Sequence, residues 1–403
     1  MLLKIIVFYL FVFTINLPSQ TDSVNENHIE ENYLLLFDKL TKGITFNYKG
    51  DLFSGFSKNI KNKNTYIDNF ELILNLDLKD ITGWNGLKLK ASLLRIHGID
   101  PNEFVCTAQG ISNIAATPSL KLYELWLEQN LLNDNLSILV GLYDLNTEYD
   151  TRQTSAIFIN PSQGIGAEYS HTGINGPSIF PNTSFGLRVR YNINSTFNIK
   201  TAIMDAIPGN ILNKNDGFLI STELNYESSS EKFNAGYYSY VIGGWYYSSS
   251  FKKYLDTEID GNCIFQKGNY GIYLSAEEFI FGERENSTKG LAVFGRLGLA
   301  NRNVNMIEGY FGAGLIYTGL ISGRDDDIIG LAIASIHNSN KYVAQMSYEN
   351  IKVHEYENIT ELTYLFYLSK WLKIQPDIQY VLNPTFSTND YFFVYGVRFD
   401  LTL

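Results

Sequence analysis

The feature that most constrains this 403-residue chain is an alternation of apolar and polar residues with a period of two, which recurs from about residue 43 to the C-terminus. It is clear at 69–78 (NFELILNLDL) and returns at 187–191, 373–380 and 397–403. Successive side chains of a β-strand point to opposite faces of the sheet. Each segment therefore predicts a strand with one face in apolar surroundings and the other largely in water.

About eighteen such segments can be counted, each of roughly 9 to 14 residues, which is the length that a tilted strand needs to cross a bilayer. Beyond residue 20 no stretch approaches 18 consecutive apolar residues, so no membrane-spanning helix is predicted. A chain that spans a membrane without helices must close its strands into a barrel, because lipid cannot satisfy the hydrogen bonds of a sheet edge. The sequence thus favours an all-β, transmembrane antiparallel β-barrel.

The connectors between the segments support this prediction because they alternate between short and long. Residues 130–135 and 192–195 are short connectors, whereas 144–183 and 205–216 are long. Further short stretches (SSSEK, QKGN, NRNVN, HNSNK and LSKW) are interpreted as every second connector. Outer-membrane barrels have short turns at the periplasmic end and longer loops outside.

A secreted β-sandwich is the alternative, since its strands also alternate. Aromatic residues near the predicted strand ends favour the barrel, because Trp and Tyr gather where a membrane protein meets the two interfaces. These residues are Trp84, Trp126, Trp245, Tyr246, Tyr247, Trp371 and Tyr395.

The N-terminus predicts export. Met1 to Lys4 form a short basic start, an apolar run follows to Leu17, and residues 1–20 are interpreted as a signal peptide. An uncleaved interfacial anchor is the alternative. Residues 21–42 are predicted to be a periplasmic segment with a short helix over 33–42, and residues 43–403 the barrel.

Several classes of function are disfavoured. The net charge of −11 and the pI near 5.0 argue against a nucleic-acid partner. Five scattered histidines contain no HExxH pattern, and no cofactor or metal site is predicted. Cys106 and Cys263 lie far apart, and whether they pair is left open. A histidine-based hydrolase remains an alternative, because the members of a catalytic triad need not be close in sequence.

Particular segments carry a family resemblance. They include LFDKLTKGITFNYKGDLF (36–53), LNLDLKDITGWNGLKLKASLLRIHG (74–98), QGISNIAATPSLKLYELWLEQ (109–129) and WLKIQPDIQYVLNP (371–384). In these blocks the chain resembles the carbohydrate-selective porin family, OprB type. The resemblance implies an outer-membrane barrel, usually of 16 strands, with selectivity for sugars. Sixteen strands are therefore predicted with eighteen as the alternative, and a long loop around 248–268 would account for two false strands. The chain ends in Leu403, whereas outer-membrane barrels often end in Phe.

If the apolar face of each strand meets lipid, the opposite face lines the pore. This rule predicts the following pore-lining, substrate-binding residues: Arg95, His97, Glu124, Trp126, Glu128, Arg188, Arg190, Asp205, Asp377 and Arg398. A mixture of donors, acceptors and an aromatic ring suits a neutral sugar. The long connector 144–183 is predicted to fold inward and narrow the channel, with Arg152 and Glu168 as constriction residues, and an exposed surface loop is the alternative.

The sequence therefore predicts a porin of the bacterial outer membrane that lets small neutral sugars, such as mono- and disaccharides, diffuse passively. Its predicted partners are these sugars and outer-membrane lipids, and both a monomer and a homo-oligomer are compatible with the pattern. A general or cation-preferring porin is the first alternative, because the acidic balance favours cations. A plugged structural barrel and a barrel hydrolase are the others.

Overall fold

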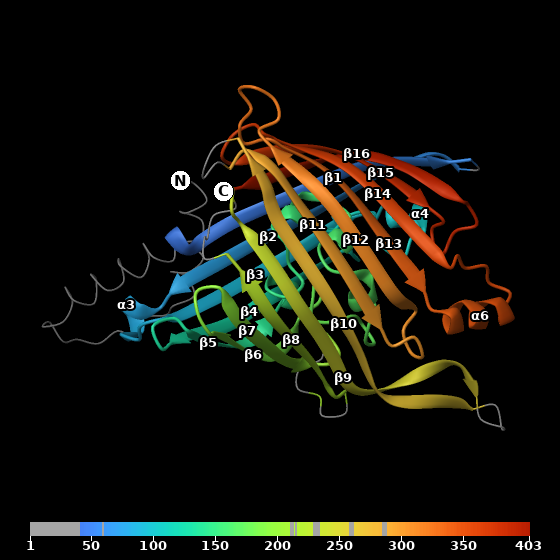
Figure 1. The fold of residues 1–403 in the computed structure, drawn as a ribbon, viewed down its shortest axis with the longest axis horizontal. Coiled ribbons are helices and arrows are strands. Elements are labelled where there is room, and N and C mark those ends of the chain that lie inside the picture. Colours follow the sequence, from blue (N-terminus) through green and yellow to red (C-terminus); the bar gives the residue numbers. More distant parts are fainter. Residues whose placement is uncertain are drawn as a thin grey trace, which may run out of the picture.

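A computed structural model describes residues 41–403 except 59, 210–212, 214–215, 229–233, 258–261 and 284–287. Within these residues, sixteen antiparallel strands form a closed barrel in which each strand pairs with its neighbours in sequence and β1 pairs with β16 (Figure 1). The predicted barrel of sixteen strands is thereby confirmed, and the alternative count of eighteen is wrong. No helix among the described residues is long and apolar enough to cross a membrane.

The strands have the following bounds: β1 Ile44–Ser57, β2 Ile60–Asp77, β3 Leu87–Gly98, β4 Ser119–Leu131, β5 Leu136–Tyr143, β6 Ser184–Asn192, β7 Phe197–Asp205, β8 Phe218–Glu227, β9 Tyr238–Thr257, β10 Cys263–Gly282, β11 Gly290–Ala300, β12 Ile307–Thr318, β13 Ile328–Asn338, β14 Tyr356–Tyr367, β15 Leu372–Leu382 and β16 Tyr391–Thr402. The α-helices are α3 Lys79–Thr82, α4 Asn102–Val105, α5 Ala167–Ser170 and α6 Asn340–Tyr348. Residues 41–43 are helical and lead into β1. The predicted signal peptide and the remainder of the predicted 33–42 helix lie outside the described residues.

Buried and exposed side chains alternate along the strands, because one face of the closed wall points into the barrel and the other points outward. In β11, Ala292, Phe294 and Arg296 are buried inside the barrel, whereas Leu297 and Leu299 are exposed on its outer surface. Closure through ten β1–β16 residue pairs, from Asn47–Thr402 to Phe56–Phe393, gives the backbone groups of both terminal strands a partner. The wall therefore has the apolar outer surface that a bilayer requires.

The loop that the sequence suggested around 248–268 is wrong for residues 248–257 and 263–268. These residues belong to the ends of β9 and β10, which continue beyond their other neighbours: pairing with β8 reaches Tyr247 and pairing with β11 stops at Gly271. The resulting hairpin leans on α6, where the rings of Tyr254 and Tyr342 lie 5.2 Å apart and Lys341 contacts Asp256 at 3.4 Å. Packing against a distant helix stabilises this extension, and the local pattern gave no sign of it.

The two ends of the barrel differ, as Figure 1 shows. We call the end where β1 begins and β16 finishes the terminal end, and the opposite end, with α4 and α6, the loop end. The prediction from the connectors was partly wrong: QKGN (266–269) lies inside β10, and NRNVN (301–305) and HNSNK (337–341) lie at the loop end together with 144–183. Cys106 and Cys263 are both free thiols.

Candidate functional site

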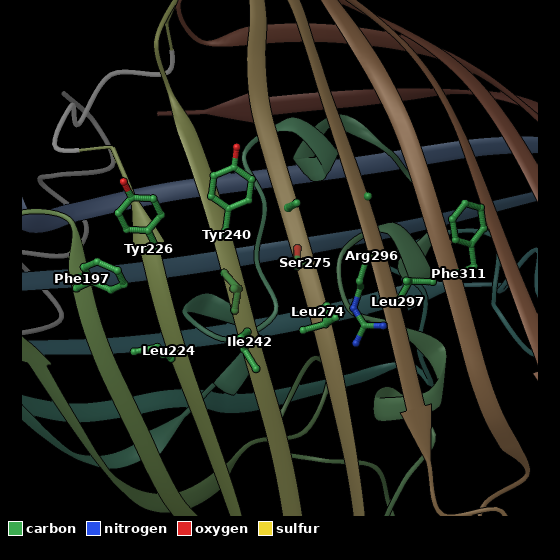
Figure 2. A pocket seen from close by; sticks show the side chains of 13 residues that line it. Phe197, Leu224, Tyr226, Tyr240, Ile242, Leu274, Ser275, Arg296, Leu297 and Phe311 are labelled. Atoms are coloured by element: carbon green, nitrogen blue, oxygen red, sulfur yellow. The ribbon is translucent and has the colours of Figure 1, made fainter.

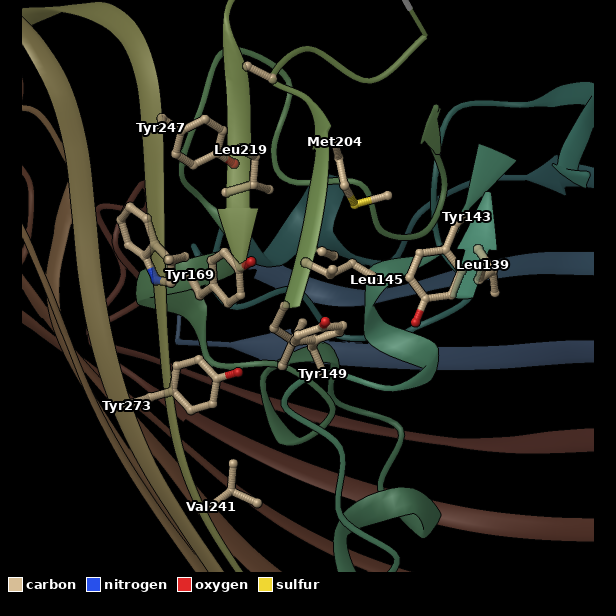
Figure 3. Packing of buried hydrophobic residues seen from close by; sticks show 14 of the residues in the cluster. Leu139, Tyr143, Leu145, Tyr149, Tyr169, Met204, Leu219, Val241, Tyr247 and Tyr273 are labelled. Atoms are coloured by element: carbon tan, nitrogen blue, oxygen red, sulfur yellow. The ribbon is translucent and has the colours of Figure 1, made fainter. Parts of the chain in front are cut away.

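The segment between β5 and β6, residues 144–183, lies inside the barrel. It is built from short turns of helix, Leu145–Thr147, Thr154–Ile157, Pro161–Gln163 and α5, so it exposes many backbone N–H groups to its surroundings. Its tyrosines pack on the inner wall (Figure 3): the Tyr169 ring stacks on Trp245 at 5.3 Å and on Tyr273 at 6.1 Å. The interior beside β8–β10 is therefore a packed aromatic core.

Glutamates on the inner wall hold this segment through its backbone. Glu223 on β8 accepts a 2.6 Å hydrogen bond from the N–H of Asp150. Glu277 on β10 accepts hydrogen bonds from the N–H groups of residues 153 and 154 at 3.1 and 2.8 Å. Glu361 on β14 accepts from the N–H groups of residues 159 and 160 at 2.5 and 3.1 Å. Charge-assisted bonds of this kind are roughly twice as strong as neutral ones, and three strands therefore fix one long connector.

Arg296 on β11 is the ionic centre of the same interface. Its guanidinium forms two hydrogen bonds with Glu168, at 2.9 and 2.8 Å, and contacts Asp150 at 2.7 Å. Burial alone would raise the pKa of Asp150, but Arg296 and Arg152 hold that pKa below its usual value. Gly298 leaves the space that the Glu168 carboxylate occupies.

Arg152 and Glu168, the two predicted constriction residues, thus lie close together inside the barrel. Both are almost completely buried, and Arg152 donates to Asp150 at 2.8 Å and to the carbonyl of Gln163 at 2.9 Å. The burial and these contacts indicate that the two side chains hold the inward segment in shape. Neither side chain offers an open surface to a solute.

The connector between β3 and β4, residues 99–118, also folds inward. Glu357 on β14 accepts from the N–H groups of Ala108 and Gln109 at 2.9 and 3.0 Å. Three strands along the wall, Ser112 donates to Asp51 on β1 at 2.6 Å, and Asp51 is paired with Arg398 on β16 at 2.7 Å. Two inward segments therefore narrow the barrel from the loop end.

Asp377 and Arg398, both predicted to line the pore, point inward but are covered. Asp377 is buried and accepts from Gln379 at 3.0 Å, and Gln379 in turn donates to the carbonyl of Ile111 at 2.9 Å. Arg398 is occupied by Asp51 and Ser112. Both side chains therefore belong to the contact between the wall and the 99–118 segment.

A less covered strip of inner wall lies on β3–β7. Trp126 is half-buried, and its indole N–H donates to Glu124 at 3.1 Å, while Lys90 pairs with the same carboxylate. Gly141, which has a φ of 144°, allows this close packing, since a side chain there would collide with the backbone of Trp126. The ring is thereby fixed against the wall.

Further along the strip, Glu128 joins the predicted residues Arg188 and Arg190. Arg188 donates to Glu128 at 2.8 Å and to Glu148 of the inward segment, also at 2.8 Å. Arg190 lies 4.0 Å from Glu128, with 36% of its side chain exposed. The structure therefore brings five predicted residues into one strip of mixed charge: Glu124, Trp126, Glu128, Arg188 and Arg190.

The predicted directions of Arg95, His97 and Asp205 are wrong. Arg95 and His97 share the outward face of β3 with the exposed Leu93, while Leu94 and Ile96 point inward. By alternation along β7, Asp205 shares the outward face of the exposed Ile203. The rule placed every apolar face toward lipid. Inward segments give the barrel apolar cores of its own, and Leu94 and Ile96 pack there against Ile114.

Several residues of the site were missed by the reasoning from sequence. They are Lys90, Glu148, Asp150, Lys200, Glu223, Glu277, Arg296, Glu357 and Glu361. An inward-facing carboxylate on a strand was the available signal for the wall glutamates. Their partners could not be found in the same way. Every residue except proline has a backbone N–H group, and the sequence does not show which of these groups will face the wall.

Asp144 gives a prediction for the dependence of stability on pH. Burial raises the pKa of Asp144 to about 7, and the neighbouring Glu124 acts in the same direction. This pKa lies above the unfolded value of 3.8, so ionisation of Asp144 destabilises the folded barrel. The loss of folding stability is absent below about pH 4, grows as the pH rises to about 7 and then levels off at a limit of about 4 kcal/mol. In Asp144→Asn we expect a weaker loss of thermal stability between pH 5 and 8 than in the wild type.

The control for this measurement is Asp327→Asn. Burial acts to raise the pKa of Asp327, but hydrogen bonds from Arg324 and Tyr367 hold it below its usual value. Its contribution is therefore constant between pH 5 and 8 and is lost only in stronger acid. Equal pH slopes for wild type and Asp144→Asn would contradict the prediction.

A groove of about 530 Å³ lies on the outer surface of the barrel and is shown in Figure 2. Its walls are exposed apolar side chains, among them Ile242, Leu274, Leu297 and Phe311. These side chains point away from the lumen, so the groove is not part of a solute path. Within the described part of the chain, no group of His, Cys, Asp and Glu side chains could hold a metal ion.

Comparison with known proteins agrees with this geometry. The model of a family described as "Carbohydrate-selective porin, OprB family" matches residues 61–403. Porin B of Pseudomonas aeruginosa is 22% identical over 363 residues, which cover 79% of this chain and 77% of that protein. The high pH structure of Pseudomonas putida OprB superposes with a TM-score of 0.80 and 18% identity over 96% of this chain and 99% of that one. The low pH structure of the same protein gives 0.59 and 17%, over 96% and 100%.

Proposed function

This chain belongs to the OprB family of carbohydrate-selective porins and is a porin of the bacterial outer membrane, and we propose that it lets small neutral sugars diffuse passively along the β3–β7 strip. The proposed path passes the partly buried Trp126 on β4, and the inward segment 144–183 approaches the same strip through Glu148, which accepts a hydrogen bond from Arg188. The porin family and the barrel fold support a channel rather than an enzyme.

The chemistry of the strip suits a sugar. A neutral sugar presents hydroxyl groups, which donate and accept hydrogen bonds, and apolar C–H faces that stack on aromatic rings. The side chains of Lys90 and Arg190 are 18% and 36% exposed and offer donors, and Glu128, 10% exposed, offers an acceptor, whereas Glu124 is 1% exposed and is paired with Lys90. Each contact is weak and replaceable, which lets a solute leave as easily as it enters.

The observation that carries the proposal is the fixed Trp126 ring. Its N–H bond to Glu124 holds the indole against the wall, and the ring is still half-buried rather than covered. A preorganised aromatic surface beside paired charges distinguishes a sugar path from a channel lined by one sign of charge.

Swelling of liposomes that contain the purified, folded porin tests this function. We expect fast swelling in isosmotic glucose, arabinose and maltose, and slow swelling in a neutral amino acid of similar size. Rates that depend on solute size alone would instead indicate a general porin, and absence of swelling from a folded barrel would indicate a plugged lumen.

Trp126→Ala should lower the rate of sugar-driven swelling severalfold. Stacking of the C–H face of a sugar on an aromatic ring is worth about 1 kcal/mol, which is roughly a fivefold effect on occupancy of the strip. The amino acid rate should change much less. Trp371→Ala is the control, because that side chain is 50% exposed in the turn between β14 and β15. If liposomes with either variant swelled in sugar at the same rate, Trp126 would not be part of the sugar path.

A cation-preferring porin is the second candidate, and the net charge of −11 favours it. The reversal potential in a gradient of potassium chloride separates the two. A potential near zero supports a path of balanced charge, whereas a strong cation preference with equal swelling in sugar and amino acid supports the second candidate.

A further inference from the structure

Arg95 and His97 form a charged cluster with Asp68 on the outer wall of β2 and β3. Arg95 Nη1 lies 3.2 Å from one oxygen of Asp68, and His97 Nδ1 lies 3.7 Å from the other. The two basic side chains are 48% and 60% exposed, while Asp68 beneath them is 8% exposed. The cluster thus presents its guanidinium and imidazole groups to the surroundings and keeps its carboxylate against the wall.

The surface around this cluster is apolar. Arg95 is directly opposite Leu120 on β4 and Phe70 on β2, and Leu93 and Leu52 are exposed on the same outer face. In an outer-membrane barrel this face meets lipid, where an arginine is costly at the midplane and tolerated near the interfaces. β3 finishes at Gly98, directly after His97, at the loop end. The cluster therefore lies at the rim where lipid headgroups are found.

The charge of this sector differs from that of the whole chain. The protein carries a net charge of −11, yet the β1–β2 hairpin next to the cluster carries three exposed lysines, Lys58, Lys61 and Lys63. Within the described residues, the bond to Asp68 is the one hydrogen bond that Arg95 donates. Most of the five N–H groups of its guanidinium therefore point to the surroundings.

We propose that Arg95 and His97 bind the phosphate group of a lipid in the outer leaflet. The planar guanidinium can donate two parallel hydrogen bonds to phosphate oxygens, and the imidazole supplies another donor beside it. Asp68 positions both side chains, while Leu93 and its exposed partner Leu122 on β4 contact the acyl chains below. The inference rests on the outer-membrane location and is independent of the sugar path on the opposite face of the wall.

Native mass spectrometry of the purified porin in detergent tests this site. The probes are lipid A with its phosphates, dephosphorylated lipid A and phosphatidylglycerol. The variant Arg95→Gln/His97→Gln keeps polar side chains of similar size and removes the charge. We expect it to retain phosphorylated lipid A about tenfold less than the wild type does, since charge-assisted bonds to phosphate are among the strong ones.

Arg324→Gln is the matched control. Arg324 is 36% exposed and paired with Asp327 at 2.7 Å, but it lies at the terminal end, so retention of lipid A should be unchanged. Equal retention of lipid A in the double variant, or equal binding of dephosphorylated lipid A, would overturn the proposal, whereas phosphatidylglycerol that the wild type binds and the double variant loses would support a phosphate site and identify a phospholipid as its ligand. Loss of an oligomer without any change in bound lipid would assign the patch to a second copy of the chain and would overturn it too.

Liposome swelling separates failure of this inference from failure of the proposed function. The double variant should transport sugars at the wild-type rate, because both side chains point away from the lumen. A folded double variant with altered sugar flux would place the cluster in the solute path and would contradict the lipid site. Unchanged flux together with lost lipid retention supports it.

Discussion

Replacement of Arg296 with methionine should release the inward segment 144–183 and widen the channel. The change leaves Glu168 and Asp150, both nearly inaccessible to solvent, without their main cation. Removal of one partner from a buried ionic group costs about 3–5 kcal/mol, because the remaining charge is uncompensated. The segment can escape this cost by moving into the water-filled lumen, so we expect a severalfold higher single-channel conductance and loss of discrimination between sugars and amino acids.

Conductance in planar bilayers measures the widening, and limited proteolysis in detergent detects the released segment. The triple variant with Arg296→Met, Glu168→Gln and Asp150→Asn removes the unpaired charges and should regain part of the closed state. The guanidinium also lies 4.9 Å from the Tyr273 ring and 5.0 Å from the Tyr310 ring, so packing is lost in both variants. Wild-type conductance in the single variant would show that the segment does not depend on this ionic centre.

The barrel could be predicted from the sequence because its determinants are local. Alternation within one strand decides which residues share a face, and 16 crossings repeat that signal. The β9–β10 hairpin shows the limit. Its extension depends on Tyr342 and Lys341 of α6, more than 80 residues away. A contact of that range is invisible in a period-two pattern.

The direction of individual side chains was predicted less well, for a physical reason. The rule that apolar faces meet lipid holds for a water-filled barrel, and it correctly turned Glu124, Trp126 and Arg188 inward. It fails where inward segments make the interior dry, as at Leu94 and Ile96. There the apolar face of β3 is the inner one, and Arg95 is displaced to the outside.

Where inward segments fill the interior, a buried glutamate on the wall has a different role from one that faces water. On a solvated pore wall a glutamate is an open ligand for solutes, as the sequence-based reasoning assumed for Glu168. Here Glu223, Glu277 and Glu361 are occupied by backbone N–H groups, which a segment without regular structure must satisfy somewhere. Glutamates on the wall therefore anchor the inward segments, whereas contact between a glutamate and a solute belongs to the proposed sugar path.

Glu357→Ala should detach the 99–118 segment and destabilise the folded barrel by about 3–5 kcal/mol. This carboxylate accepts hydrogen bonds from three N–H groups, those of Ala108, Gln109 and Thr385, at 2.9, 3.0 and 2.6 Å, as well as from the hydroxyl of Thr107. Each buried donor that loses its partner costs about 1–3 kcal/mol, and partial solvation by the lumen keeps the total below the simple sum. Unfolding in urea, followed by tryptophan fluorescence, measures the change.

Glu355→Ala is the matched control for that experiment. It also removes a glutamate, two residues before Glu357, but the side chain of Glu355 is 53% exposed. Its effect should stay within about 0.5–1 kcal/mol, as for other surface ion pairs. Glu357→Gln should lie between the two, since an amide has one oxygen to accept hydrogen bonds and presents its own N–H groups to the remaining donors. If all three variants unfolded at the same urea concentration, Glu357 would not be what holds the 99–118 segment, and apolar packing, such as that of Phe104 against Phe392 on β16 at 6.4 Å, would have to do so.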